Sequence, residues 1–164
     1  MSLNATLRSY GSRTRMLIEI KSRKWDQECG RSDKLTHRVM AAIPESIPKG
    51  YTENIFILSF DPSVLVLAQK LEPNLRYILN FTHPVLPNTL NLKDSDRLFG
   101  VCIPIKELEK SFTGKWHDKG KLVATYGCNA SPQVSKALSL GADIIMTDKP
   151  AWLFNFLRMI DFIV

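Results

Sequence analysis

The sequence predicts an α/β fold, built as an incomplete (β/α)8 barrel of parallel strands covered by helices. Short apolar runs alternate with helix-length segments along the 164 residues, which is typical of a parallel sheet with helical crossovers. Three of these runs end in polar residues that are followed by a proline and a helical pattern. A complete barrel usually needs about 250 residues. We therefore expect residues 1–164 to form one partial domain.

The first expected strand is MLIEIKS, residues 16–22, and we expect residues 1–14 before it to be irregular. Ser32 is a suitable cap for a helix that runs toward Ala42. Residues 41–54, AAIPESIPKGYTEN, are expected to form a loop broken by Pro44 and Pro48.

The next strand is IFILSF, residues 55–60, and it leads into Asp61 and Pro62. Asp61 can cap the following helix, while Pro62 fills its first position, where no amide donor is needed. RYILNF, residues 76–81, is a further extended run.

The second half of the chain repeats this pattern. LVATYG (122–127) precedes a helix that begins near Ser131 and stops at Gly141. IIMTD (144–148) precedes the closing apolar segment, and LFGVCIPI (98–105) is another extended run. The pattern indicates a sheet whose strands are joined by covering helices.

The closing segment, residues 151–164, is the most apolar stretch, but it carries Arg158 and Asp161 and is shorter than a membrane span. We interpret it as a helix that covers the barrel. No apolar run reaches about 20 residues, and the first residues lack a secretory signal. We therefore expect a cytoplasmic protein without a transmembrane segment, whose three cysteines are reduced.

Residues 1–38 supply most of the net charge of +6, because they hold nine Lys or Arg and four Asp or Glu. No zinc-finger spacing or helix-turn-helix pattern accompanies these cations, so we expect no nucleic-acid partner. A solvated basic face and a site for an acidic phosphate ligand both remain open.

Ligands of parallel α/β folds bind at the carboxyl ends of the strands. In residues 16–22 the side chains alternate, so Leu17, Glu19 and Lys21 should share one face. Glu19 could bind a hard divalent cation and Lys21 a phosphate oxygen. The alternative is that these two charges neutralise each other or meet neighbouring charges.

Further polar residues fall at or just beyond predicted strand ends: Ser59, Asn80, Tyr126, Asn129, Thr147 and Asp148. Each by itself is more often a turn or capping residue, and Asp148 is expected to cap the last helix. His83 could reach this polar rim. His117 and Asp118 precede a strand and should lie at the opposite face, where barrels place residues for stability.

Four segments in register, between about residues 15 and 157, resemble the glycerophosphodiester phosphodiesterase family: LIEIKS, ILSFDPSVL, KLVATYGCN and LGADIIMTDKP. The resemblance implies a distorted β/α barrel that hydrolyses glycerophosphodiesters to an alcohol and glycerol 3-phosphate with calcium or magnesium. It makes Glu19 a metal ligand and Lys21 a phosphate contact. Tyr126, where the family often has Trp, would line the substrate site, and Thr147 and Asp148 match a structural turn.

The family's His-Arg motif, its Glu-x-Asp pair and its second catalytic His have no counterparts here, so the sequence offers no catalytic residue of its own. We expect the isolated chain to be inactive; the alternative is a non-catalytic or regulatory remnant that binds a phosphorylated ligand. Three missing strands and the six extended runs would make nine strands, which is more than an eight-stranded barrel holds. One run, residues 98–105, is therefore expected to be an irregular extension. Exposed sheet edges should favour self-association.

Overall fold

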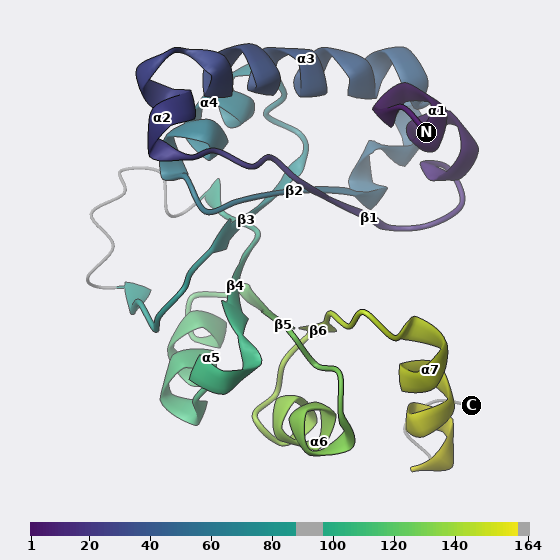
Figure 1. Cartoon of the computed structure of the whole chain (residues 1–164), viewed down its shortest axis with the longest axis vertical. Coiled ribbons are helices and arrows are strands. Elements are labelled where there is room, and N and C mark those ends of the chain that lie inside the picture. Colours follow the sequence, from purple (N-terminus) through teal and green to yellow (C-terminus); the bar gives the residue numbers. More distant parts are fainter. Residues whose placement is uncertain (88–96, 161–164) are drawn as a thin grey trace. The chain divides into compact units, whose positions relative to one another are not determined.

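The computed structural model describes residues 1–87 and 97–160, which divide into two compact units (Figure 1). The first unit comprises residues 1–80 with residues 97–99, and the second comprises residues 81–87 and 100–160. Each unit contains three parallel strands and the helices that follow them. The alternation of strand and helix predicted from the sequence is confirmed in both.

In the first unit the strands are β1 (Met16–Glu19), β2 (Ile55–Ser59) and β3 (Arg76–Asn80). Its helices are α1 (Leu3–Tyr10), α2 (Lys24–Glu28), α3 (Arg31–Ser46) and α4 (Pro62–Leu71), with a 3-10 helix at Lys49–Asn54. The register pairs Ile18 with Ile57 and Ile57 with Tyr77. The Tyr77 hydroxyl donates to the carbonyl of Ala68 in α4, 3.0 Å away, so these three residues face the helices.

The residues that alternate with these three along each strand point to the opposite face of the sheet, which we call the inner face. Phe56 pairs with Leu17 and with Arg76 on this face. The Arg76 guanidinium lies 5.3 Å from the centre of the Phe56 ring and 4.8 Å from that of the Phe99 ring. Because both contacts fall within the range of cation–π attraction, the amino-terminal end of the inner face is covered by a charged group held between two rings.

Two expectations for the first unit are wrong. Residues 1–14 are not irregular: α1 begins after Ser2, whose hydroxyl accepts from the Ala5 amide, and it buries Leu7 to 1% exposure. Few strongly apolar residues occur in this helix, so its buried position did not stand out in the sequence. The helix expected from Ser32 to Ala42 instead follows Gly30, in the left-handed region at φ 68°, and extends through residues 43–46.

In the second unit the strands are β4 (Gly100–Pro104), β5 (Leu122–Tyr126) and β6 (Ile144–Ile145). Its helices are α5 (Lys110–His117), α6 (Ser131–Ser139) and α7 (Pro150–Met159), with a 3-10 helix at Ile105–Glu107. Phe81, Phe112 and Trp116 pack their rings together at centroid distances of 6.1 to 6.4 Å. This aromatic cluster anchors α5 in the core.

The expectation that residues 98–105 form an irregular extension is wrong, because β4 is a regular buried strand in parallel register with β5. Gly100 permits this close pairing: a Cβ atom there would lie 2.6 Å from the Leu122 carbonyl oxygen. The structure therefore describes six strands, and an eight-stranded barrel would need two more.

Apart from α3, whose predicted Ser32 cap is wrong, the helix boundaries follow the predicted capping in two of three cases. Asp61 accepts from the Ser63 amide with Pro62 in the first turn of α4, and Gly141 follows α6 at φ 77°, as expected. Asp148 does not cap α7, because the helix begins after Lys149 and no side chain caps it. Asp161 and the rest of residues 161–164 lie outside the described residues. In the described part of the chain, no helix is both long and apolar enough to cross a membrane.

Candidate functional site

The carboxyl end of β1 carries the two predicted ligands. Glu19 is exposed and lies on the inner face, since it pairs with Leu58 in the register that pairs Leu17 with Phe56. The Ile20 amide extends the pairing by donating to the Leu58 carbonyl at 2.8 Å. The alternation predicted from the sequence, with Glu19 away from the helices and Ile20 buried, is confirmed.

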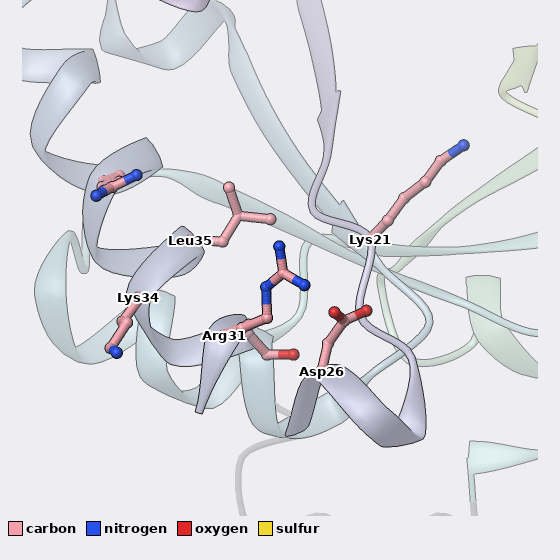
Figure 2. Close-up of a pocket in the computed structure, with 7 residues that line it drawn as sticks. Lys21, Asp26, Arg31, Lys34 and Leu35 are labelled. Atoms are coloured by element: carbon pink, nitrogen blue, oxygen red, sulfur yellow. The ribbon is translucent and has the colours of Figure 1, made fainter. Parts of the chain in front are cut away.

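Lys21 follows this strand and is also exposed. Among the described residues, Glu19 and Lys21 form no ion pair with each other, so mutual neutralisation does not account for them. Figure 2 shows the Lys21 side chain extending away from Arg31. Both side chains are thus accessible to a ligand at the strand end.

A buried carboxylate holds the segment after β1 against β2. Asp61 is 7% exposed, and it accepts hydrogen bonds from Ser22 Oγ at 2.7 Å, Gln27 Nε2 at 2.6 Å and the Ser63 amide at 2.9 Å. Burial by itself would raise the pKa of Asp61, but the hydrogen bonds from Ser63, Ser22 and Gln27 outweigh it and lower the pKa. Ser22 Oγ also lies 2.7 Å from Ser32 Oγ, which fixes the first turn of α3.

A basic pocket of about 380 Å³ opens beside this network (Figure 2). Its lining residues come from the segment after β1, from α2 and from α3: Lys21, Asp26, Arg31, Ser32, Lys34, Leu35 and Arg38. Four of the seven side chains are cationic and one is a carboxylate, so an anion fits the pocket best.

The described residues do not complete a divalent cation site. They contain no group of three or more His, Cys, Asp or Glu side chains that could hold a metal. Calcium takes six to eight oxygen ligands and magnesium near-octahedral geometry, whereas the strand end offers the single carboxylate of Glu19. A metal there would need ligands from outside the described chain.

The predicted polar rim of the second unit forms a closed hydrogen-bonded turn. The Asn129 side-chain oxygen accepts from Thr147 Oγ1 at 2.9 Å and from the Asp148 amide at 2.8 Å, and its nitrogen donates to Asp148 Oδ2 at 2.7 Å. These residues therefore have the structural role that the resemblance implied for the turn. Tyr126 is half-buried at the end of β5, and its contact with substrate stays a prediction.

Other polar residues considered from the sequence have local roles. Ser59 Oγ is buried and donates to the Ile20 carbonyl at 2.8 Å. Asn80 is 6% exposed, and its Oδ1 has no hydrogen-bond partner in the described residues. His83 is exposed. His117 pairs with Asp143 at 2.9 Å beside the start of β5, on the amino-terminal side as expected, but its partner is not Asp118.

The excess of cations in residues 1–38 was evident from the sequence, but their concentration on one face of α3 was not predicted, and neither was the role of Asp61 beyond capping. The spacing of Arg31, Lys34 and Arg38 was a usable signal, because residues three and four apart share one face of a helix. The bonds from Ser22 and Gln27 to Asp61 span 39 and 34 residues, and no local pattern marks contacts of that range.

No protein-family model and no curated protein matches the chain. Solved structures do. A protein from Galdieria sulphuraria, named as a candidate glycerophosphodiester phosphodiesterase, is similar with a TM-score of 0.77 at 19% identity, over 95% of this chain and 62% of that one. An Oleispira antarctica phosphodiesterase, in complex with the product sn-glycerol-3-phosphate, gives 0.65 at 19% identity, over 77% of this chain and 51% of that one.

The similarity extends to a second group of proteins. An EAL domain protein from Listeria monocytogenes has a TM-score of 0.59 at 16% identity, over 86% of this chain and 61% of that one. This chain thus spans between about half and two thirds of the length of these structures. The comparisons confirm the predicted incomplete barrel, and the resemblance inferred from the sequence is confirmed for the fold. The fold of this chain is that of part of the barrel found in glycerophosphodiester phosphodiesterases.

Proposed function

We propose that this chain is part of a glycerophosphodiester phosphodiesterase, which in its complete domain hydrolyses glycerophosphodiesters to an alcohol and glycerol 3-phosphate. The observation that carries the proposal is the position of Glu19 and Lys21 at the carboxyl end of β1, in a fold shared with phosphodiesterases, one of which holds glycerol 3-phosphate. Ligands of this fold class bind at that end of the strands.

In the complete domain Lys21 would contact a phosphate oxygen, and its positive charge would stabilise the negative charge that develops on the phosphoryl oxygens in the transition state. Glu19 would be one ligand of a calcium or magnesium ion, and Tyr126 would line the substrate site. A histidine supplied by the missing strands would protonate the leaving alcohol. The isolated chain lacks these partners, so we expect it to be inactive.

The test compares the 164-residue chain with a version extended upstream by its own reading frame. Hydrolysis of glycerophosphocholine is followed with calcium or magnesium added. We expect activity from the extended version and its loss in Glu19→Gln. Glu45→Gln is the matched control, because Glu45 is an exposed carboxylate of α3 that lies outside the proposed site.

Two results would refute this proposal: an extended version that binds metal and remains inactive, or hydrolysis by the short chain that Glu19→Gln does not change. The basic pocket favours one alternative, a non-catalytic protein that binds a phosphorylated ligand. That alternative predicts binding of glycerol 3-phosphate by the extended version without turnover of the diester.

A further inference from the structure

One face of α3 is basic along its first two turns. Arg31, Lys34 and Arg38 follow each other at intervals of three and four residues, with Leu35 between them, so they lie on the same side of the helix. The opposite side is buried and includes Thr36, Val39 and Met40. Packing of the buried side therefore orients the cationic side toward solvent.

These cations are not balanced by local acids. In residues 1–87 and 97–160, no carboxylate lies within ion-pair distance of Lys21, Arg31, Lys34 or Arg38. Asp26, the one acid of the pocket, instead accepts a hydrogen bond from the Arg23 amide at 3.3 Å. Figure 2 shows the Asp26 and Arg31 side chains pointing to the same side of the pocket. Asp26 offsets one of the four cations, so the lining carries a net charge of +3.

This arrangement is unfavourable for the free protein. Cations in the first turns of a helix oppose its dipole, which is positive at the amino terminus. Like charges three and four residues apart also repel each other. A bound anion would reverse both effects, because it would be attracted by the side chains and by the helix end.

Hydrogen bonds and one cation–π contact also hold the pocket in shape. Ser32, in its floor, is 3% exposed and is tied through Ser22 to Asp61. At the rim, the Arg31 guanidinium lies 5.2 Å from the centre of the Trp25 ring, and 62% of Trp25 is exposed. The contact with Trp25 restricts the Arg31 side chain before any ligand arrives, which lowers the entropy lost on binding.

We propose that this pocket is a second anion-binding site, centred on α3 and adjacent to the phosphate contact that Lys21 makes at the strand end, and that it binds a phosphate monoester. Arg31 and Arg38 donate to the phosphate oxygens, and Lys21 lies between the two sites. A dianion suits the net charge of the lining better than a zwitterion such as choline phosphodiester. A statement about substrates rests on the proposed function: if that function holds, the preferred glycerophosphodiesters carry a phosphorylated head group.

The test measures binding to the 164-residue chain by isothermal titration calorimetry. The probes are inositol 1-phosphate, which carries a monoester dianion, and glycerophosphocholine, which has no net charge. The pocket variant is Arg31→Gln/Arg38→Gln. The control variant is Lys110→Gln/Lys115→Gln, which removes the same charge from exposed positions of α5.

We expect inositol 1-phosphate to bind at least about tenfold more weakly to the pocket variant and unchanged to the control, since each lost hydrogen bond to a charged group has an effect of that order. Affinity should fall as salt is added. Arg31→Lys/Arg38→Lys keeps the charge and should restore part of the affinity, and circular dichroism checks that each variant is folded.

Vesicles of phosphatidylcholine with phosphatidylinositol 4-phosphate test whether the monoester comes from a lipid head group. If the chain sediments with these vesicles and only the pocket variant loses this binding, the ligand is a lipid head group. If the chain binds inositol 1-phosphate and not the vesicles, the ligand is a free metabolite. An equal loss of binding in the pocket and control variants overturns the proposal. It is also overturned if the wild-type chain binds neither inositol 1-phosphate nor the vesicles with phosphatidylinositol 4-phosphate. Because no step requires hydrolysis, an inactive extended chain would leave this result unaffected.

Discussion

Asp61 links the pocket segment to the sheet, and its replacement is the most direct test of how the first unit is held together. Asp61→Ala removes the acceptor of the Ser22 and Gln27 hydrogen bonds and the cap of α4. Asp61→Asn keeps a side-chain oxygen for the cap but removes the charge. The difference between the two variants separates the cap from the long-range bonds.

The expected magnitudes follow from these contacts. Loss of a helix cap costs about 1 kcal/mol, and hydrogen bonds to a charged group contribute about 1.5–3 kcal/mol each. Gln27 is exposed, so water replaces part of its bond. We therefore expect Asp61→Ala to lower the free energy of unfolding by about 3 kcal/mol and Asp61→Asn by about half of that.

The effect should depend on pH with a defined sign. The pKa of Asp61 is lowered in the folded chain, so its charge stabilises the fold above the unfolded value of about 3.9. That stabilisation is lost as the pH falls through the lower folded value. The gap between the wild-type chain and Asp61→Asn should be full at neutral pH and should close below about pH 4.

Urea unfolding, monitored by circular dichroism, measures the total change in the free energy of unfolding. Amide hydrogen exchange locates it, because β2 belongs to the first unit and β5 to the second. Protection should fall in β2 and remain in β5. A loss below about 1 kcal/mol in Asp61→Ala, or a gap to Asp61→Asn that stays constant down to pH 3 or so, would refute this account of Asp61.

Three further predictions concern single features of the chain. Gly100→Ala should destabilise the second unit by about 1–3 kcal/mol in urea unfolding, because its Cβ would meet the Leu122 carbonyl; an unchanged midpoint contradicts this. Lys34→Gln should stabilise the free chain by about 0.5 kcal/mol, since it relieves repulsion from Arg31 and Arg38; a loss of stability is the opposing result. The isolated chain should self-associate, because among the described strands β1 pairs with β2 alone; light scattering that finds only monomer rules this out.

The sequence predicted the elements whose signals are local. The run at residues 55–59 and the Asp61 and Pro62 pair after it mark a strand and a helix start, and both form as expected. The strand at Gly100–Pro104 was misjudged because a strand count taken from the resemblance outweighed its apolar pattern. The helix at Leu3–Tyr10 was missed because only one of its residues is buried.

For the candidate site, the side-chain alternation of β1 was sufficient to place Glu19 on the inner face, because a strand has a period of two. The sequence could not show that Asp148 forms hydrogen bonds with Asn129, 19 residues away, and does not cap the helix that follows. The pocket likewise combines residues from the segment after β1, from α2 and from α3. Tertiary packing decides which of several plausible partners a polar side chain finds.

The cluster of Phe56, Arg76 and Phe99 has a consequence for access to the sheet. Arg76 is the first residue of β3 and Phe56 the second of β2, so the two rings and the guanidinium cover the beginnings of these two strands. The guanidinium remains partly hydrated because a third of its side chain is exposed. Small molecules would then approach β2 and β3 from the end where Glu19 and Lys21 are located. One-sided entry of this kind would bring an incoming anion past Lys21 before it meets any apolar side chain of β2.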